Sequence, residues 1–261
     1  MQPQASIGKS CLRSYAVALL LRRLVVASCK CKVGAAVPTK HGFYKRAANY
    51  WAGVPATING VLAGYENISD IDIEGSKEFL DHVLSSENPP NTNLALDCGA
   101  GIGRVTKRLL NHYFNKVDLV EQDAKFINAA KQYLSEDNDK LGTLYQIGLQ
   151  NFVPEKKYDV IWCQWVLGHL KDHDFVAFFK RCSRSLAKHG VIVVKENINP
   201  DNEVEYDDDD SSVTRPHTLM IKLFDDADLH LIESKIQRDF PSNIFPVHMF
   251  ALNNYLSISK N

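Results

Sequence analysis

The sequence predicts an α/β fold with a doubly wound, mostly parallel sheet, and three features of the chain lead to this prediction. Short apolar stretches alternate with helical stretches between residues 94 and 227. A glycine-rich turn follows the first apolar stretch and precedes a helix. Two apolar stretches near the C-terminus are separated by a short loop, which predicts an antiparallel hairpin at one edge. Strands that alternate with helices form parallel sheets covered by helices on both faces.

The expected elements follow in chain order. Residues 43–65 form helical stretches broken at Pro55, residues 76–84 place their apolar side chains on one helical face, and residues 87–93 form a loop. The seven predicted strands cover residues 94–97, 117–120, 144–147, 158–162, 191–195, 231–238 and 248–252. The helices between them cover residues 104–113, 124–134, 172–186 and 219–227.

The composition fits one folded domain with an extension. The 261 residues are 45% hydrophobic, which excludes a disordered or collagen-like chain. A net charge of −1 argues against a general nucleic-acid binder, which carries a basic surplus. Nine of the 30 basic residues and none of the 31 acidic residues lie within residues 1–65, so residues 66–261 carry a net charge of −10.

Residues 1–42 are expected to form a basic, flexible N-terminal extension, followed by one domain over residues 43–261. The apolar stretch 16–28 is interrupted by Arg22 and Arg23, and it is too short and too charged to span a membrane. An Arg-rich segment without acids also fits a mitochondrial transit peptide, which stays as an alternative. The six cysteines show no C-x-x-C and no zinc-like spacing, so no metal is expected.

The glycine-rich turn, DCGAGIGR over residues 97–104, is the most specific local motif. Its G-x-G-x-G spacing differs from the dinucleotide motif G-x-G-x-x-G, and the P-loop motif is absent. Glu121 ends the next predicted strand, where a carboxylate can accept both ribose hydroxyls of an adenosine. This pattern is typical of S-adenosylmethionine methyltransferases. A purely structural glycine turn and a nicotinamide enzyme remain alternatives.

Residues 158–170, YDVIWCQWVLGHL, closely resemble a segment of the protein N-terminal methyltransferases, which methylate the α-amine of chains beginning Xaa-Pro-Lys. Further pieces that match this family are FYKRAANYW, NGVLAGY, LDCGAGIGRVTKRLL, VVKEN, DSSVTR and MFAL. The resemblance covers residues 43–252. It implies a seven-stranded sheet of the methyltransferase type, S-adenosylmethionine as cofactor, and protein N-termini as partners, with no nucleic acid and no membrane. A nuclear and cytoplasmic location is expected.

The resemblance also implies roles for individual residues. Cofactor contacts are implied for Gly99, Gly101, Gly103, Arg104, Glu121, Gln122, Asp123, Leu149, Gln150 and Gln164. An acid–base pair at the substrate amine is implied for His169 and Asp210, with Asn197 hydrogen-bonded to that amine. Substrate contacts are implied for Trp165 (proline), Asp207 and Ser212 (lysine), and Tyr50, Trp51 and Ile68 (access channel). Phe245 departs from the family, which often has Tyr there.

These residue types suit amine methylation. An α-amine has a pKa of about 7.7–8.0, so a proton must leave before the nitrogen can react, and a His or Asp can take it. If the segment after the strand is helical, Trp165 and His169 share one side. By residue type alone, residues 207–210 favour a solvated loop, with Asp210 or Ser211 capping a following helix.

Two other functions stay open on the residues. A methyltransferase acting on a small-molecule amine or hydroxyl would have an apolar lid rather than acids near the active face. A non-catalytic adaptor would have lost the loop glycines or the acid–base pair, and this chain retains both.

Overall fold

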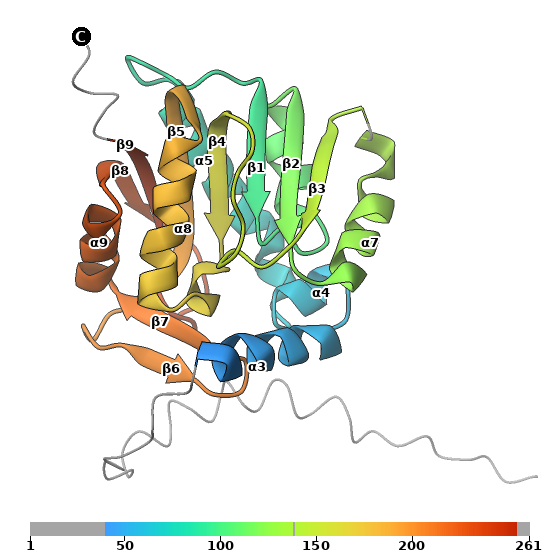
Figure 1. Ribbon diagram of the computed structural model, residues 1–261, viewed down its shortest axis with the longest axis vertical. Coiled ribbons are helices and arrows are strands. Elements are labelled where there is room, and N and C mark those ends of the chain that lie inside the picture. The colour runs from blue at the N-terminus through green and yellow to red at the C-terminus, as the bar shows by residue number, and fades with distance from the viewer. Residues whose placement is uncertain (1–39, 138, 255–261) are drawn as a thin grey trace, which may run out of the picture.

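A computed structural model describes residues 40–137 and 139–254 of the chain. Its centre is a mixed sheet of nine strands in the order β3-β2-β1-β4-β5-β7-β6, with β9 paired to β5 and β8 paired to β9 (Figure 1). The first five strands of this order pair in parallel with one another: β3 (Leu141–Gln146), β2 (Lys116–Glu121), β1 (Leu94–Cys98), β4 (Tyr158–Gln164) and β5 (Leu186–Asn199). The predicted doubly wound parallel sheet is therefore confirmed.

The predicted antiparallel edge is also confirmed. β8 (Leu229–Ile236) and β9 (Val247–Asn254) form a hairpin, and β9 runs antiparallel to β5. The seven predicted strands correspond to β1–β5, β8 and β9. The count of seven is incomplete, because β6 (Glu205–Asp207) and β7 (Ser212–Pro216) form a second hairpin at the end of β5.

The expectation that Asp210 or Ser211 caps a helix is wrong. The strand β7 follows these residues, and the next helix, α9 (His217–Asp226), begins only at His217. Asp210 instead closes the β6–β7 turn, since its Oδ1 accepts a hydrogen bond of 2.9 Å from the Ser212 N–H. The alternation of Val213 and Arg215, both buried, is the strand pattern that the acidic run concealed.

Helices cover both faces of the sheet, with α8 (Asp172–Arg184) in front and α5 (Ser69–Leu84) behind (Figure 1). One buried cluster joins the sheet to α8 and α9, and a second joins it to α5, α6 (Arg104–Arg108) and the end of α7 (Ala124–Tyr133). α5 begins seven residues before the predicted start. The helix predicted over 104–113 is interrupted at Leu109 and continues as the 3-10 turn η2 (Leu110–His112). A further turn, η3 (Ser135–Asp137), follows α7.

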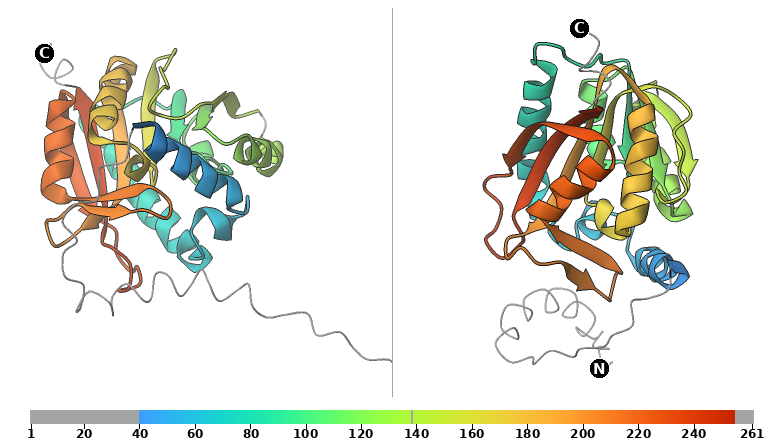
Figure 2. Two further views of the ribbon diagram at one scale, coloured as in Figure 1. Left: turned by 60° about the horizontal axis from the view of Figure 1, so that its bottom comes forward. Right: turned by 60° about the vertical axis from the view of Figure 1, so that its left-hand side comes forward.

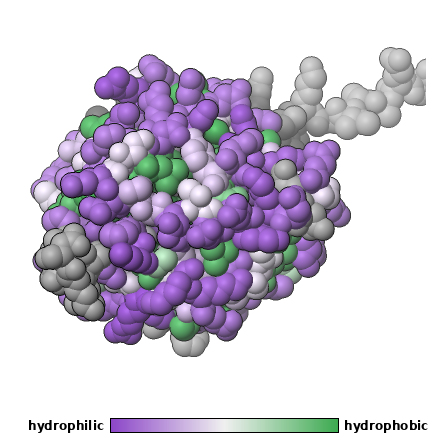
Figure 3. Space-filling model, turned by 90° about the horizontal axis from the view of Figure 1, so that it is seen from above, coloured by the Kyte–Doolittle hydropathy of each residue, from purple (hydrophilic) through white to green (hydrophobic). Residues whose placement is uncertain are grey.

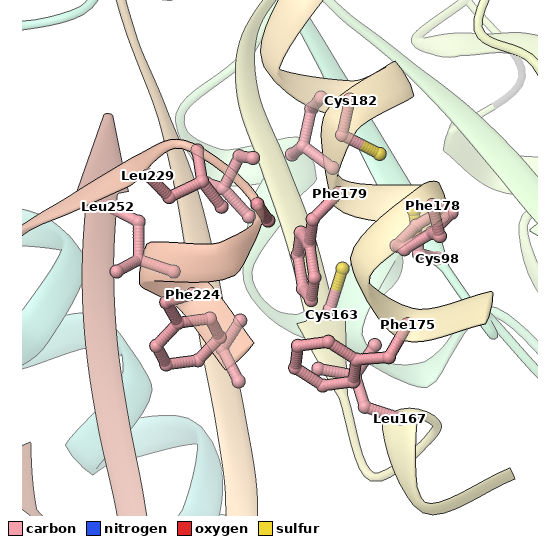
Figure 4. Packing of buried hydrophobic residues seen from close by; sticks show 14 of the residues in the cluster. Cys98, Cys163, Leu167, Phe175, Phe178, Phe179, Cys182, Phe224, Leu229 and Leu252 are labelled. Carbon is pink, nitrogen blue, oxygen red and sulfur yellow. The ribbon is translucent and has the colours of Figure 1, made fainter. Parts of the chain in front are cut away.

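The front cluster contains three of the six cysteines. Cys98, Cys163 and Cys182 pack among Phe175, Phe178 and Phe179 of α8 (Figure 4). Cys98, Cys163 and Cys182 are all buried. Burial also raises the pKa of the Cys98 and Cys182 thiols, so these groups stay neutral core side chains at physiological pH.

α3 (Lys40–Gly53) lies across the end of the molecule towards which β1, β2 and β4 point (Figures 1 and 2). The short helix α4 (Ile58–Val61) and the turn η1 (Glu66–Ile68) connect it to α5. The opposite end of the molecule shows mainly hydrophilic residues with small, separate hydrophobic areas (Figure 3). In the part of the chain that the structure describes, no helix is both long and apolar enough to cross a membrane.

Candidate active site

A cavity lies at the carboxyl ends of β1, β2 and β4 and is lined on one side by α3, in the place where doubly wound sheets bind ligands. Eleven residues predicted from the sequence line it: Trp51, Gly99, Gly101, Arg104, Glu121, Gln122, Leu149, Gln150, Gln164, Trp165 and His169. Side chains from α3, the glycine turn and the end of β4 thus meet in one place, although they are up to 118 positions apart in the chain.

The glycine turn needs glycine for two different reasons. Gly99, Gly101 and Gly103 all have positive φ, at 72°, 55° and 80°. A Cβ on Gly99 would lie 2.4 Å from Val166 Cγ2, so the turn packs tightly against the segment after β4. A Cβ on Gly103 would lie 2.9 Å from Leu134 Cδ1, and Gly103 is not among the cavity residues. Gly103 therefore serves the packing of α6.

Glu121 ends β2 at the cavity wall and fastens the glycine turn. Its Oε2 accepts a hydrogen bond of 3.0 Å from the Gly101 N–H, and its Oε1 accepts one of 2.9 Å from the Asp123 N–H. Burial raises the pKa of Glu121, although these N–H donors act in the opposite direction. Asp123 lies outside the lining and caps α7 by accepting from the Lys125 N–H at 2.7 Å.

A buried ionic network holds Arg104. Its Nη1 lies 2.8 Å from Asp72 Oδ2, while Lys195 Nζ lies 2.7 Å from Asp72 Oδ1. Gln164 Nε2 also donates to both oxygens of Asp72 at 2.9 Å. Burial opposes ionisation of Asp72, but Lys195 and Arg104 outweigh it and lower the pKa of the carboxyl group. Two predicted cofactor residues, Arg104 and Gln164, are thus oriented by one carboxylate that the sequence pattern did not reveal.

His169 has both ring nitrogens in hydrogen-bond contact. The Trp51 indole Nε1 donates to His169 Nε2 at 2.9 Å, so Nε2 is the unprotonated acceptor nitrogen. The proton of the neutral ring consequently lies on Nδ1, which is 3.4 Å from the Ser211 carbonyl oxygen. Burial lowers the pKa of His169, while the charges of Asp210 and Asp207 oppose this change.

The β6–β7 turn brings Asp207 and Asp210 into electrostatic contact with His169, although neither acid lines the cavity itself. Burial raises the pKa of Asp210, and the Ser212 N–H and the charge of His169 work against this shift. A carboxylate with a raised pKa is a stronger base than an exposed one. The predicted pair His169 and Asp210 is thus assembled beside the cavity by two separate segments.

Trp165 follows β4 with a φ of +51° and is held by a 3.0 Å hydrogen bond from its N–H to the Lys195 carbonyl. The segment after β4 is not an α-helix but contains the single 3-10 turn η4 (Leu167–His169), and Trp165 and His169 line the same cavity. Trp165 stacks on Phe240 with ring centroids 6.4 Å apart. Its indole Nε1 is buried and has no hydrogen-bond partner among the described residues.

The remaining predicted residues lie outside the lining. Tyr50 packs edge-on against Trp51, Ile68 is buried beside α5, and Asn197 sits in β5 opposite Val247. In the β6–β7 turn, Asp207 accepts from the Asp209 N–H and Ser212 begins β7.

Several lining residues were not predicted, among them Tyr44, Ala47, Asp97, Phe126 and Ile147. Asp97 is the penultimate residue of β1 and is buried, which raises its pKa to about 6, although a hydrogen bond from Thr106 opposes this. The D-x-G-x-G motif contains Asp97 and could have identified it. Tyr44 and Ala47 of α3 lie in the matching piece FYKRAANYW, but no chemical feature of these two residues distinguishes them from ordinary helix residues until the helix crosses the cavity.

The cavity residues fit S-adenosylmethionine. Glu121 offers a carboxylate to ribose hydroxyls, Ile147, Leu149 and Phe126 offer apolar walls to an adenine, and Arg104 offers a cation to a carboxylate. Gly99 and Gly101 line the cavity without a side chain, so a ligand can approach their backbone closely. Among the described residues, no group of His, Cys, Asp or Glu could hold a metal ion.

Comparison with known proteins identifies relatives of this chain. The family model described as AdoMet-dependent proline di-methyltransferase matches residues 39–253. N-terminal Xaa-Pro-Lys N-methyltransferase 1 of Xenopus tropicalis is 48% identical over 213 residues, which cover 80% of this chain and 95% of the relative. Alpha N-terminal protein methyltransferase 1 of Drosophila melanogaster is 46% identical over 212 residues, covering 80% and 75%.

Solved structures agree with these matches. A SAM-dependent methyltransferase from Leishmania major superposes with a TM-score of 0.77 at 36% identity, covering 85% of this chain and 87% of that one. Magnesium protoporphyrin IX methyltransferase from Synechocystis PCC 6803, solved with bound SAM, has a TM-score of 0.60 at 14% identity and covers 85% and 100%. This second likeness concerns the fold alone.

Proposed function

The chain belongs to the AdoMet-dependent proline di-methyltransferase family, and we propose that it methylates the α-amine of proteins that begin Xaa-Pro-Lys after removal of the initiator Met. The chain is a methyltransferase that uses S-adenosylmethionine. The observation that carries the substrate assignment is the placement of His169 and two acids, Asp207 and Asp210, at one side of the cofactor cavity.

The cavity supports a definite orientation of the cofactor. Glu121, Gln122 and Leu149 would hold the adenosine end, and Arg104, oriented by Asp72, would pair with the methionine carboxylate. When bound, S-adenosylmethionine supplies an electrophilic methyl group on a sulfonium. Val166, the residue after Trp165, packs directly on Gly99 of the glycine turn. The segment that would contact the peptide is therefore in contact with the turn that would contact the cofactor.

The acids of the β6–β7 turn suit a cationic peptide. A chain beginning Xaa-Pro-Lys carries an ammonium at its N-terminus and a second one on its lysine, and both are attracted by Asp207 and Asp210. Proline has a fixed φ and no N–H, so it presents a flat apolar ring to Trp165. In this proposal Ser212 helps Asp207 to bind the lysine, Asn197 binds the amine, and Tyr50, Trp51 and Ile68 border the access channel.

The proton leaves the substrate ammonium towards Asp210. Burial strengthens Asp210 as a base, whereas the His169 lone pair at Nε2 is already occupied by the Trp51 N–H. The freed nitrogen lone pair then forms the new N–C bond as the S–C bond breaks. His169 stays neutral with its Nδ1 proton facing the Ser211 carbonyl, and it accepts a proton at Nε2 only when Trp51 withdraws its hydrogen bond. Holding the amine in line supplies most of the acceleration.

The test incubates each of three peptides with the full-length protein and labelled S-adenosylmethionine, and compares the label that each peptide gains. A Ser-Pro-Lys peptide should gain label on its α-amine, located by fragment-ion mass spectrometry, which also counts the methyl groups added. An N-acetylated copy should gain none, and a Ser-Pro-Glu copy should react poorly because the acids repel its third residue. Label on the acetylated peptide, or on a small-molecule amine instead of the peptides, would refute the proposal. No label on any acceptor, together with tight cofactor binding, would favour the adaptor.

We also propose a nuclear and cytoplasmic location, with mitochondrial targeting by residues 1–42 as the alternative. Most of this segment lies outside the described residues, so the proposal depends on the resemblance alone. Microscopy of a fluorescent protein fused behind residues 1–42 tests it, because mitochondrial fluorescence would establish the alternative.

A further inference from the structure

The segment Trp165–Leu170 carries two candidate site residues on very little regular structure. It contains only the turn η4, and Trp165 at its start has a positive φ. Trp165 and His169 both line the cavity from this segment. Side chains of other elements must therefore hold its backbone in place.

Glu196 of β5 binds the start of the segment. Its Oε1 accepts hydrogen bonds from two consecutive backbone N–H groups, those of Val166 at 2.8 Å and Leu167 at 2.7 Å. Glu196 is only 8% exposed. A carboxylate oxygen bonded to adjacent amides fixes both peptide planes at once, as an N-terminal cap does for a helix.

Arg215 of β7 binds the end of the same segment. Its Nη1 donates to the Leu167 carbonyl at 3.0 Å, and its Nη2 donates to the Leu170 carbonyl. Its Nε donates to Asp172 Oδ1 at 2.9 Å, and the whole side chain is 2% exposed. The planar guanidinium makes these three contacts from three separate nitrogens, whereas a lysine offers only one nitrogen.

The segment Trp165–Leu170 packs against the glycine turn on one side and against β7 on the other. A Cβ on Gly99 would collide with Val166, and a Cβ on Gly168 would lie 3.2 Å from the Val213 carbonyl. The segment is thus packed between the glycine turn and β7, with no room to shift independently. A displacement of its backbone would move His169 relative to Asp210 and move Trp165 relative to Phe240.

We propose that Glu196 and Arg215 form a clamp on the segment Trp165–Leu170 and act as positioning residues for methyl transfer. Glu196 holds the N–H groups of the segment and Arg215 holds its carbonyls. The inference rests on the proposed function, because it assigns the clamp to the placement of His169 and Trp165 in that reaction. A shift of about 1 Å at such residues costs on the order of 100-fold in rate.

The chain provides a matched control. Asp159, at the other end of β4, is 4% exposed, and its Oδ2 accepts 2.9 Å hydrogen bonds from the consecutive N–H groups of Asn93 and Leu94. Glu196→Ala and Asp159→Ala therefore remove the same kind of bond, one beside the cavity and one far from it. Both variants should lose thermal stability, since each leaves two backbone amides without their side-chain acceptor.

Only Glu196→Ala should lower kcat for the Ser-Pro-Lys peptide, by on the order of 100-fold at a temperature where both variants are folded. Glu196→Gln keeps an acceptor at Oε1 and should recover most of the loss, and Arg215→Lys should behave like Glu196→Ala. The cofactor Kd, measured by calorimetry, should change only a few-fold in all of them. Equal kcat for the two alanine variants at equal folded fraction would overturn the clamp.

A readout independent of activity separates the clamp from the proposed function. The ¹H–¹⁵N indole signals of Trp51 and Trp165, assigned with Trp→Phe variants, should shift in Glu196→Ala and stay in place in Asp159→Ala. Unmoved indole signals would contradict the clamp even in an active enzyme. An inactive wild-type protein would overturn the proposed function while the indole signals still decide the clamp.

Discussion

The Trp51 indole nitrogen lies 2.9 Å from His169 Nε2, and the two rings meet edge-on with centroids 5.7 Å apart. This contact joins α3, which covers the cavity, to the candidate acid–base pair. It assigns the proton of the neutral imidazole to Nδ1 and occupies the nitrogen that would otherwise accept a proton. The helix that encloses the cofactor cavity therefore also controls the protonation of His169.

Replacing Trp51 by Phe should raise the pKa of His169. Burial lowers this pKa in the wild type, and the Trp51 N–H further favours the neutral ring because it needs the Nε2 lone pair. Phe lacks the donor and leaves space for water, so both effects act upwards. An NMR titration of the ring signals, identified with His169→Gln, measures the change. A pKa that stays or falls in Trp51→Phe would show that the hydrogen bond does not control the ring.

Replacing Asp210 by Asn should reduce kcat by on the order of 10²- to 10⁴-fold, the range of a general base, while the cofactor Kd stays near the wild-type value. The amide oxygen of Asn can still accept from the Ser212 N–H, so the β6–β7 turn should keep its shape. Asp208→Asn is the matched control, since Asp208 is an exposed neighbour in the same turn. Equal losses in both variants would mean that the turn contributes only its total charge.

Replacing Lys125 by Met should loosen α3 and weaken cofactor binding. Lys125 Nζ donates to the Trp51 and Ala52 carbonyls at 3.0 and 2.9 Å and to the Val54 carbonyl, so one ammonium satisfies the C-terminal end of α3. Hydrogen bonds to a charged group contribute about 1.5–3 kcal/mol, which corresponds to at least a tenfold higher cofactor Kd if α3 must close for binding. Calorimetry measures this Kd, with Lys131→Met on the exposed side of α7 as the control. An unchanged Kd would show that α3 does not have to be closed.

Replacing Glu196 by Gln should change how stability depends on pH. Burial raises the pKa of Glu196 to about 7 from its ordinary 4.5, against the opposing hydrogen bonds of Leu167 and Val166. The folded protein then holds this proton more tightly than the unfolded chain, so the group favours folding at low pH and loses that contribution between pH 4.5 and 7. The Tm of Glu196→Gln relative to wild type should therefore increase from pH 5 to pH 8. A constant difference would indicate an ordinary carboxyl group.

Much of the architecture followed from sequence pattern, because each core strand is a short apolar run bounded by turn residues. The errors have physical causes. The predicted strand 191–195 extends from Leu186 to Asn199; beyond Lys195 the strand continues through the polar Glu196, whose partners lie in the segment Trp165–Leu170. The hairpin β6–β7 was missed because four consecutive aspartates at its turn conceal two short strands.

The sequence by itself determined the fold class and the glycine turn, since these depend on periodicity and on glycines at fixed spacings, and its resemblance to a known family identified eleven of the cavity residues. The tertiary structure alone decided which side chains orient and hydrogen-bond the residues of the site. Asp72 orients Arg104, and the Trp51 indole donates to His169 Nε2. Glu196 and Arg215 hold the segment Trp165–Leu170. Each of these contacts joins elements far apart in the chain, and a hydrogen bond across such a separation exists only once the sheet has brought its two ends together.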